Sequence, residues 1–173
     1  DEKALKEHAK SLGKIVMGPD CGTAIIDGIP LAFANVVNKG PIGLVAASGT
    51  GLQDVTVLID RFGGGITQAI GTGGHDLSAE IGGISMLTGL DMLAKDEATK
   101  IITLISKPPA KEVVKAILDK ANLIDKKAFL GKLFYSLIGN KSNFYIHYLN
   151  IKFRKTYIYF PVNHSTPHLK KFI

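Results

Sequence analysis

The sequence predicts an α/β fold in which helices cover a parallel sheet. Short apolar segments rich in Ile and Val alternate with longer segments of helical periodicity, and glycine-rich breaks separate the two kinds of segment. Strands that alternate with helices of this length form parallel βαβ units, whose sheets are buried on both faces. Ligands of such sheets bind beyond the carboxyl ends of the strands. We therefore expect the functional residues in the loops that follow the strands.

The first 12 residues predict a helix, because Leu5, Ala9 and Leu12 share one helical face and Gly13 stands where helices commonly end. The next segments are predicted in order as a short strand (14–17), a turn (18–23), an extended segment (24–26) and an irregular stretch to Lys39 that contains Pro30.

From residue 40 onward the pattern becomes regular. Apolar runs predict strands at 42–46, 66–70 and 100–105. Helical spacing of apolar residues predicts helices at about 51–62, 80–94 and 110–121. The loops between these elements contain most of the polar residues that could carry chemistry.

Length and composition limit the classes of protein. A chain of 173 residues can bury one good core and at most a second, partial unit. No apolar run is long enough for a membrane span, and the first residues lack the layout of a signal peptide, so we expect a cytoplasmic protein that does not contact membranes. Because Cys21 is the only cysteine, the chain cannot form an internal disulfide or a cysteine metal cluster, and we expect no metal site.

Charge divides the chain into two regions. The first 125 residues contain 15 acidic and 12 basic residues, whereas residues 126–173 contain nine basic residues and no acidic ones. All five tyrosines also lie in the second region. Aromatic residues among lysines can bind single-stranded nucleic acid, but no arginine cluster or known motif accompanies them here, so we expect no nucleic-acid partner. The composition of 126–173 is also that of AT-rich DNA translated out of frame.

Two glycine-rich loops predict an anion site. Ser48, Gly49 and Thr50 follow the first regular strand, and Gly73, Gly74 and His75 follow the second. Glycine permits turns that leave backbone N–H groups exposed, and the first turn of a helix has N–H groups without intrahelical partners. Two such loops side by side would bind an anion. Lys107 follows the third strand and is a further candidate contact.

Each of these residues also has a purely structural interpretation. Ser48 is a suitable helix cap, His75 and Lys107 suit exposed loops, and Cys21 suits a half-buried, unreactive thiol. His75 could act in catalysis only with a carboxylate to orient its ring, and Asp76 is not expected to face it. We therefore regard the catalytic residues as unknown, with His75 as the one candidate.

Four motifs together resemble the FdrA family, which is related to the α subunit of succinyl-CoA synthetase. They are Gly18-Pro19-Asp20-Cys21-Gly22, the segment 46–54, the segment 68–77, and Ser106-Lys107-Pro108-Pro109, and the resemblance covers about residues 3–121. It implies that 1–39 is the end of a Rossmann CoA-binding domain with a linker. Residues 40–125 would be a flavodoxin-like, parallel-sheet ligase domain, and 126–173 an atypical basic tail, by one interpretation frameshifted.

The resemblance also implies a site. In the synthetase relatives the residues that match Ser48, Gly49 and Thr50 hold the phosphate of a phosphohistidine, and the turn that matches Asp20 and Cys21 lies near the CoA thiol. The implied ligands are CoA, a nucleotide or phosphate, together with a small anionic substrate. A β-type or other partner subunit, or assembly with further copies of the chain, is implied as well.

Three departures from the relatives qualify the expected activity. Lys107 stands near the position of a glutamate, His75 stands where arginine is usual, and the Gly-His-Ala-Gly-Ala motif of the phosphorylated histidine is absent from the sequence. These changes favour carbamoyl transfer to oxamate, the role implied for FdrA in allantoin breakdown, over ATP-dependent ligation. The alternative is a non-catalytic module that binds CoA or a nucleotide, or an inactive fragment.

Overall fold

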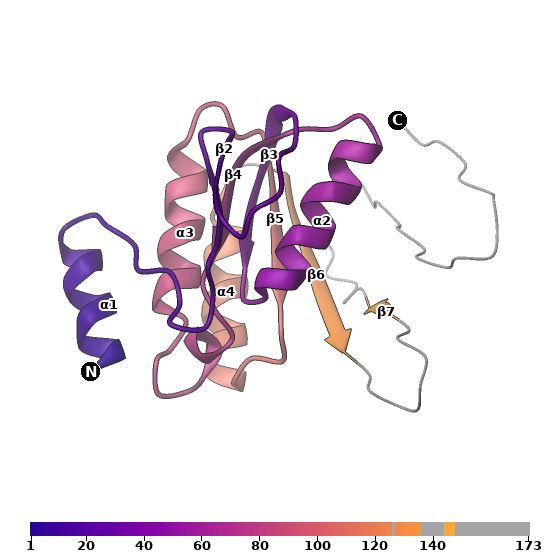
Figure 1. The fold of residues 1–173 in the computed structure, drawn as a ribbon. Helices are drawn as coiled ribbons and strands as arrows, with labels where there is room; N and C mark the ends of the chain where they lie inside the picture. The colour runs from indigo at the N-terminus through magenta and orange to yellow at the C-terminus, as the bar shows by residue number, and fades with distance from the viewer. Residues whose placement is uncertain (126, 136–143, 148–173) are drawn as a thin grey trace.

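A computed structural model describes residues 1–125, 127–135 and 144–147 (Figure 1). Within these ranges seven strands form one sheet in the spatial order β2-β1-β4-β3-β5-β6-β7. The strands are β1 (Thr23–Ile26), β2 (Ile29–Ala32), β3 (Lys39–Ala46), β4 (Ile66–Gly71), β5 (Ile101–Ser106), β6 (Lys127–Tyr135) and β7 (Phe144–His147). The helices are α1 (Glu2–Ser11), α2 (Gly49–Arg61), α3 (Ile84–Lys95) and α4 (Lys111–Asn122), with a short 3₁₀ helix η1 (His75–Leu77).

The predicted α/β fold is confirmed. The central strands β4, β3, β5 and β6 are parallel to one another, so their carboxyl ends lie at one edge of the sheet. The strands that flank this group run the other way: β1 is antiparallel to β4, and β7 is antiparallel to β6. Strands on both sides of residue 39 thus belong to one sheet, while the division of the chain into domains at that residue stays a prediction.

Alternation along β3 explains the two layers of core. Successive side chains of a strand point to opposite faces. Leu44 therefore packs with Leu52 and Ile59 of α2, whereas Val45 packs with Leu90 of α3 and its neighbours. Figure 1 shows α2 on one face of the sheet and α3 and α4 on the other. No helix in the described part of the chain is long and apolar enough to cross a membrane.

The predicted strand at 14–17 is wrong. This segment packs along α3 instead of pairing with the sheet, and Ile15 contacts the apolar cluster beneath that helix. The Ser85 hydroxyl donates a hydrogen bond to the Val16 carbonyl at 2.7 Å. A side chain of α3 thus satisfies a backbone group that a strand would have paired with a neighbour.

The stretch predicted as irregular up to Lys39 contains strand β2. Asp27 and Gly28 both have positive φ, 51° and 79°, and join β1 to β2 as a two-residue hairpin turn. Pro30 pairs with Ile25 in β2, which is the outermost strand on its side of the described sheet, the place where a sheet tolerates proline. The Asp-Gly pair between two apolar segments was the signal for this hairpin.

The remaining differences lie near the ends of elements. Helix α3 begins at Ile84 rather than near residue 80, because Gly82 and Gly83 take left-handed φ values of 76° and 73° before it. Beyond the three strands predicted from residue 40 onward, β6 pairs in parallel with β5 from Lys127 onward. Most of the basic region 126–173, including Tyr157, lies outside the described residues.

Candidate functional site

The loops after β3 and β4 meet at the carboxyl edge of the sheet. Thr72, the first residue after β4, is fully buried and donates both its N–H, at 2.7 Å, and its hydroxyl, at 3.2 Å, to the carbonyl of Ala46. Ala46 is the last residue of β3, and Ala47 donates to Ile105 of β5 at 2.8 Å. These bonds fix the starting points of the loops, so the predicted convergence of the two loops is confirmed.

The first glycine loop leads directly into α2. Ser48 is the N-cap, has extended backbone angles and is 3% exposed, and its hydroxyl accepts a hydrogen bond from the Gly51 N–H at 3.2 Å. The structural interpretation of Ser48 as a helix cap is thus confirmed. Gly49 and Thr50 form the first turn of α2, whose N–H groups have no acceptor within the helix. With the helix dipole, these donors favour a negative charge at this end of α2.

The second glycine loop is contacted by the segment that precedes β1. The Gly74 N–H donates to the carboxylate of Asp20 at 2.9 Å. Gly73 has a φ of 83°, and a Cβ atom placed on it would collide with the same carboxylate. A Cβ on Gly74 would lie 3.0 Å from the Lys107 ammonium, so Lys107 also reaches this loop. Asp20, Gly73, Gly74 and Lys107 therefore form one cluster.

Cys21 lies between the two loops. A Cβ placed on Gly49 would lie 3.4 Å from the Cys21 sulfur, and one on Gly71 would collide with it. Cys21 is half-buried and forms no disulfide. Glycine is needed at Gly71 because this sulfur and the Thr23 backbone occupy the space of a side chain. Asp20 and Cys21 thus lie beside the glycine loops, and their predicted proximity to CoA stays a prediction.

His75 faces helix α1. Its Nδ1 lies 2.7 Å from the Glu2 carboxylate, and half of its side chain is exposed. The hydrogen bond and the charge of Glu2 raise the pKa of His75 above its ordinary value. Burial disfavours the ionised form of Glu2, but hydrogen bonds from Lys6 and His75 outweigh it and lower the Glu2 pKa. Glu2 is therefore the carboxylate that orients His75, and the sequence did not single it out.

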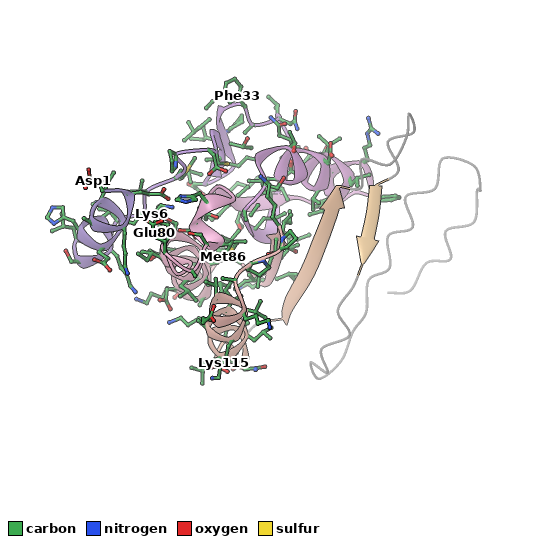
Figure 2. The ribbon with its side chains drawn as sticks, turned by 90° about the horizontal axis from the view of Figure 1, so that it is seen from below. Asp1, Lys6, Phe33, Glu80, Met86 and Lys115 are labelled. Atoms are coloured by element: carbon green, nitrogen blue, oxygen red, sulfur yellow. The ribbon has the colours of Figure 1, made fainter. Side chains whose placement is uncertain are left out.

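Asp76 is buried behind the second loop, away from His75 as expected. Its carboxylate pairs with the Lys6 ammonium at 3.0 Å, and both side chains are fully buried. It also accepts the N–H groups of Ser85 and Met86, which open α3, at 3.0 and 2.9 Å. Figure 2 shows Lys6 on the side of α1 that faces the rest of the molecule. The ion pair thus joins α1, the second loop and the start of α3.

Sequence reasoning missed Glu2 and Lys6. They are spaced i, i+4 on α1, and the Lys6 ammonium also lies 2.7 Å from Glu2. This spacing is usual for exposed helix pairs, so nothing in the pattern indicated that Lys6 is buried. Among the described residues, no group of three His, Cys, Asp or Glu side chains is placed to hold a metal ion.

Comparison with known proteins identifies the family. The CoA-binding domain family matches residues 37–124, which is just over half of the chain and contains every helix and strand from β3 to α4. The chain belongs to the CoA-binding domain family. The match includes both glycine loops and Lys107. Asp20, Cys21 and α1 precede its first residue and lie outside it.

Curated relatives of this CoA-binding domain are longer proteins. The uncharacterized protein YahF of Escherichia coli (strain K12) is 55% identical over 126 residues, which is 73% of this chain and 24% of YahF. The α subunit of ADP-forming succinate–CoA ligase of Methanothermobacter thermautotrophicus is 27% identical over 61% of this chain and 36% of its own length. The ADP-forming sulfoacetate-CoA ligase subunit SqwL of an Acholeplasma species is 29% identical over 75% and 44%. The chain thus spans less than half the length of each relative.

Solved structures share the fold of this domain. A dinucleotide-forming acetyl-coenzyme A synthetase 1 from Ca. Korarchaeum cryptofilum, in complex with phosphate and ADP, aligns with a TM-score of 0.58 at 20% identity, over 76% of this chain and 28% of the other. The ATP citrate lyase of Methanothrix soehngenii, in complex with citrate and coenzyme A, aligns with a TM-score of 0.60 at 20% identity, over 75% and 22%. Both likenesses establish a shared α/β fold.

Proposed function

We propose that this chain is the CoA- and anion-binding module of an acyl-CoA ligase of the succinyl-CoA synthetase type. The observation that carries the proposal is the convergence of the first turn of α2 with Cys21 and Lys107 at the carboxyl edge of the sheet. Backbone N–H groups and the end of a 13-residue helix suit a phosphate or carboxylate, and an ammonium nearby adds positive charge. The membership of the CoA-binding domain family supports CoA as a ligand.

The proposed ligand of the first loop is the phosphate of an acyl or carbamoyl phosphate. Within the FdrA-like assignment, carbamoyl phosphate with oxamate as acceptor is the substrate pair we propose. The cation Lys107 beside the second loop supports a small anionic acceptor rather than the steering of a phosphohistidine. Because the chain spans less than half of its curated relatives, turnover would require the rest of such an enzyme, in a longer chain, a partner subunit or further copies.

The second candidate is a module that binds CoA or a nucleotide without turnover. One observation favours this candidate. His75 is the residue of the site that we consider as a covalent phosphate carrier, but its Nδ1 pairs with the Glu2 carboxylate and its ring faces α1. A chain that binds CoA but converts neither carbamoyl phosphate with oxamate, nor CoA with ATP and an acid, would agree with this candidate and contradict the first.

Calorimetry with CoA and with inorganic phosphate tests the binding proposal. In the Gly49→Val variant the new side chain meets Cys21 and Thr23, which a Cβ alone would already approach within 3.4 and 3.3 Å, and phosphate binding should be lost. Ala98→Val is the control, because it adds a branched side chain at an exposed position before β5, away from the glycine loops, so phosphate binding should persist. Equal phosphate affinity in the parent and a folded Gly49→Val variant would contradict the proposal.

A further inference from the structure

The carboxylate of Asp20 lies where the second glycine loop would hold a ligand oxygen. Asp20 comes from the segment before β1, 54 residues earlier in the chain than its partner, and its Oδ2 accepts the Gly74 N–H at 2.9 Å. Its other oxygen lies against Gly73, so closely that a Cβ on Gly73 would collide with it. The loop therefore already contacts a negatively charged group of the protein.

The charge of Asp20 also acts on the neighbouring first loop. Cys21, the next residue, lies within contact distance of a Cβ on Gly49, so two consecutive residues contact the two loops. Two negative charges held in neighbouring loops repel each other, and the repulsion is stronger near a protein surface than in bulk water. An anion at the first turn of α2 therefore binds against the repulsion of Asp20, and the nearby Lys107 offsets only part of it.

We propose that Asp20 is a specificity-determining residue: its carboxylate closes the second glycine loop to ligand anions and weakens anion binding at the first loop. The inference rests on the proposed anion site. It explains why one loop can receive a ligand while the other, with a similar sequence, is filled by the chain itself. A ligand with one compact anionic group suits such a site better than one with two.

Two variants of Asp20 separate the effect of its negative charge from the effect of its side chain filling the second glycine loop. Asp20→Asn removes the charge but keeps an oxygen that can accept the Gly74 N–H, and Asp20→Ala removes both. Asp60→Ala is the matched control, because the Asp60 carboxylate accepts the Asn38 N–H at 2.8 Å in the same way, near the opposite end of the sheet. The measurement is calorimetric titration of the full chain and each variant with inorganic phosphate at pH 7.5, with unfolding curves for each protein.

We expect Asp20→Asn to bind phosphate about fivefold more tightly than the parent, as removal of one nearby like charge predicts. Asp20→Ala should bind more tightly still, and Asp60→Ala should match the parent. A gain in affinity cannot arise from partial unfolding, which can only weaken binding. Binding by Asp20→Ala when the parent binds too weakly to measure would also support the inference.

Two results would overturn the inference. If the parent binds phosphate and neither folded variant of Asp20 binds it more tightly, Asp20 does not control access, whereas the proposed anion site survives. If neither the parent nor any folded variant binds phosphate, the proposed site fails as well, and the inference fails with it.

Discussion

The two glycine loops of this domain have similar sequences and different surroundings. The first loop leads into α2, has its cap bond from Ser48, and presents an exposed Thr50 at the start of the helix. The second loop makes three contacts with the first 20 residues of the chain: Asp20 contacts Gly74, Glu2 contacts His75, and Lys6 contacts Asp76. Glycine content alone therefore does not predict which loop has backbone N–H groups available to bind a ligand.

The difference has a physical origin in the N-terminal segment. Helix α1 packs beside α3 (Figure 1). From there its Glu2 contacts His75 and its Lys6 contacts Asp76. The segment that follows α1 is bonded to α3 at Val16 and brings Asp20 to Gly74. The family match begins at residue 37, so the residues that close the second loop come from outside the matched segment. Four sets of variants test this contrast.

The largest expected effect comes from Lys6. Lys6→Met removes the cation but leaves the Asp76 carboxylate fully buried, and loss of one partner of a buried ion pair costs about 3–5 kcal/mol. We expect the free energy of unfolding in urea to fall by about 3 kcal/mol. Lys115→Met is the control, because the Lys115–Asp119 pair is exposed and such pairs contribute less than about 1 kcal/mol. Equal losses in the two variants would show that the ion pair does not hold α1.

Gly73→Ala should have the next largest effect. Its φ of 83° disfavours any side chain, and the added Cβ would collide with Asp20. Gly63→Ala has a similar φ of 79° but no atom within 4 Å of the new Cβ, so it measures the backbone strain alone. We expect Gly73→Ala to cost about 1–3 kcal/mol by urea unfolding, more than Gly63→Ala. The Asp20→Ala change should restore part of the difference, and no restoration would mean that Asp20 does not fill the loop.

Ser48→Ala should destabilise the first loop by about 1 kcal/mol, the usual loss of a helix N-cap. Ser78→Ala removes a comparable bond, from the Ile81 N–H to the Ser78 hydroxyl at 3.3 Å, outside the first loop. Both variants should lower the thermal midpoint slightly, but only Ser48→Ala should weaken phosphate binding. Equal phosphate affinity in both would exclude Ser48 from the anion site.

The smallest effect concerns pH and the contact between Glu2 and His75. Because the His75 pKa is raised in the folded protein, its pairing with Glu2 stabilises the fold fully below the unfolded value near 6.5 and is lost as pH rises through the folded pKa. Nuclear magnetic resonance titration of His75 should give a pKa above 6.5 in the parent and a lower one in Glu2→Gln. Glu7→Gln, on the exposed part of α1, should leave it unchanged. An unaltered His75 titration in Glu2→Gln would contradict the contact.

Much of this fold follows from local sequence patterns. The strands β3, β4 and β5 and the helices α2 and α4 were predicted within about two or three residues, since apolar periodicity and glycine breaks agree there. The segment 14–17 was misread because an apolar run packs equally well along a helix or in a sheet. Strand β2 was missed because Pro30 suggests a break, although the preceding Asp27-Gly28 indicated a hairpin.

The candidate site could be predicted only in part. The convergence of Ser48, Gly74 and Lys107 follows from the rule that parallel strands share a carboxyl edge. The partners of the second loop could not be foreseen, because Glu2 and Lys6 lie about 70 residues from His75 and Asp76, and their pairing depends on where α1 docks. Long-range contacts of charged side chains leave no periodic trace in a sequence.

The most direct test of the contrast between the loops is a phosphate titration of the ¹⁵N-labelled chain, followed by nuclear magnetic resonance. The amide signals of Gly49 and Thr50 should shift and saturate together, whereas the Gly74 amide, already bonded to Asp20, should stay in place. In Asp20→Ala the Gly74 signal should begin to respond. A parent chain in which Gly74 shifts along with Gly49, or in which Gly49 and Thr50 do not respond, would contradict the account.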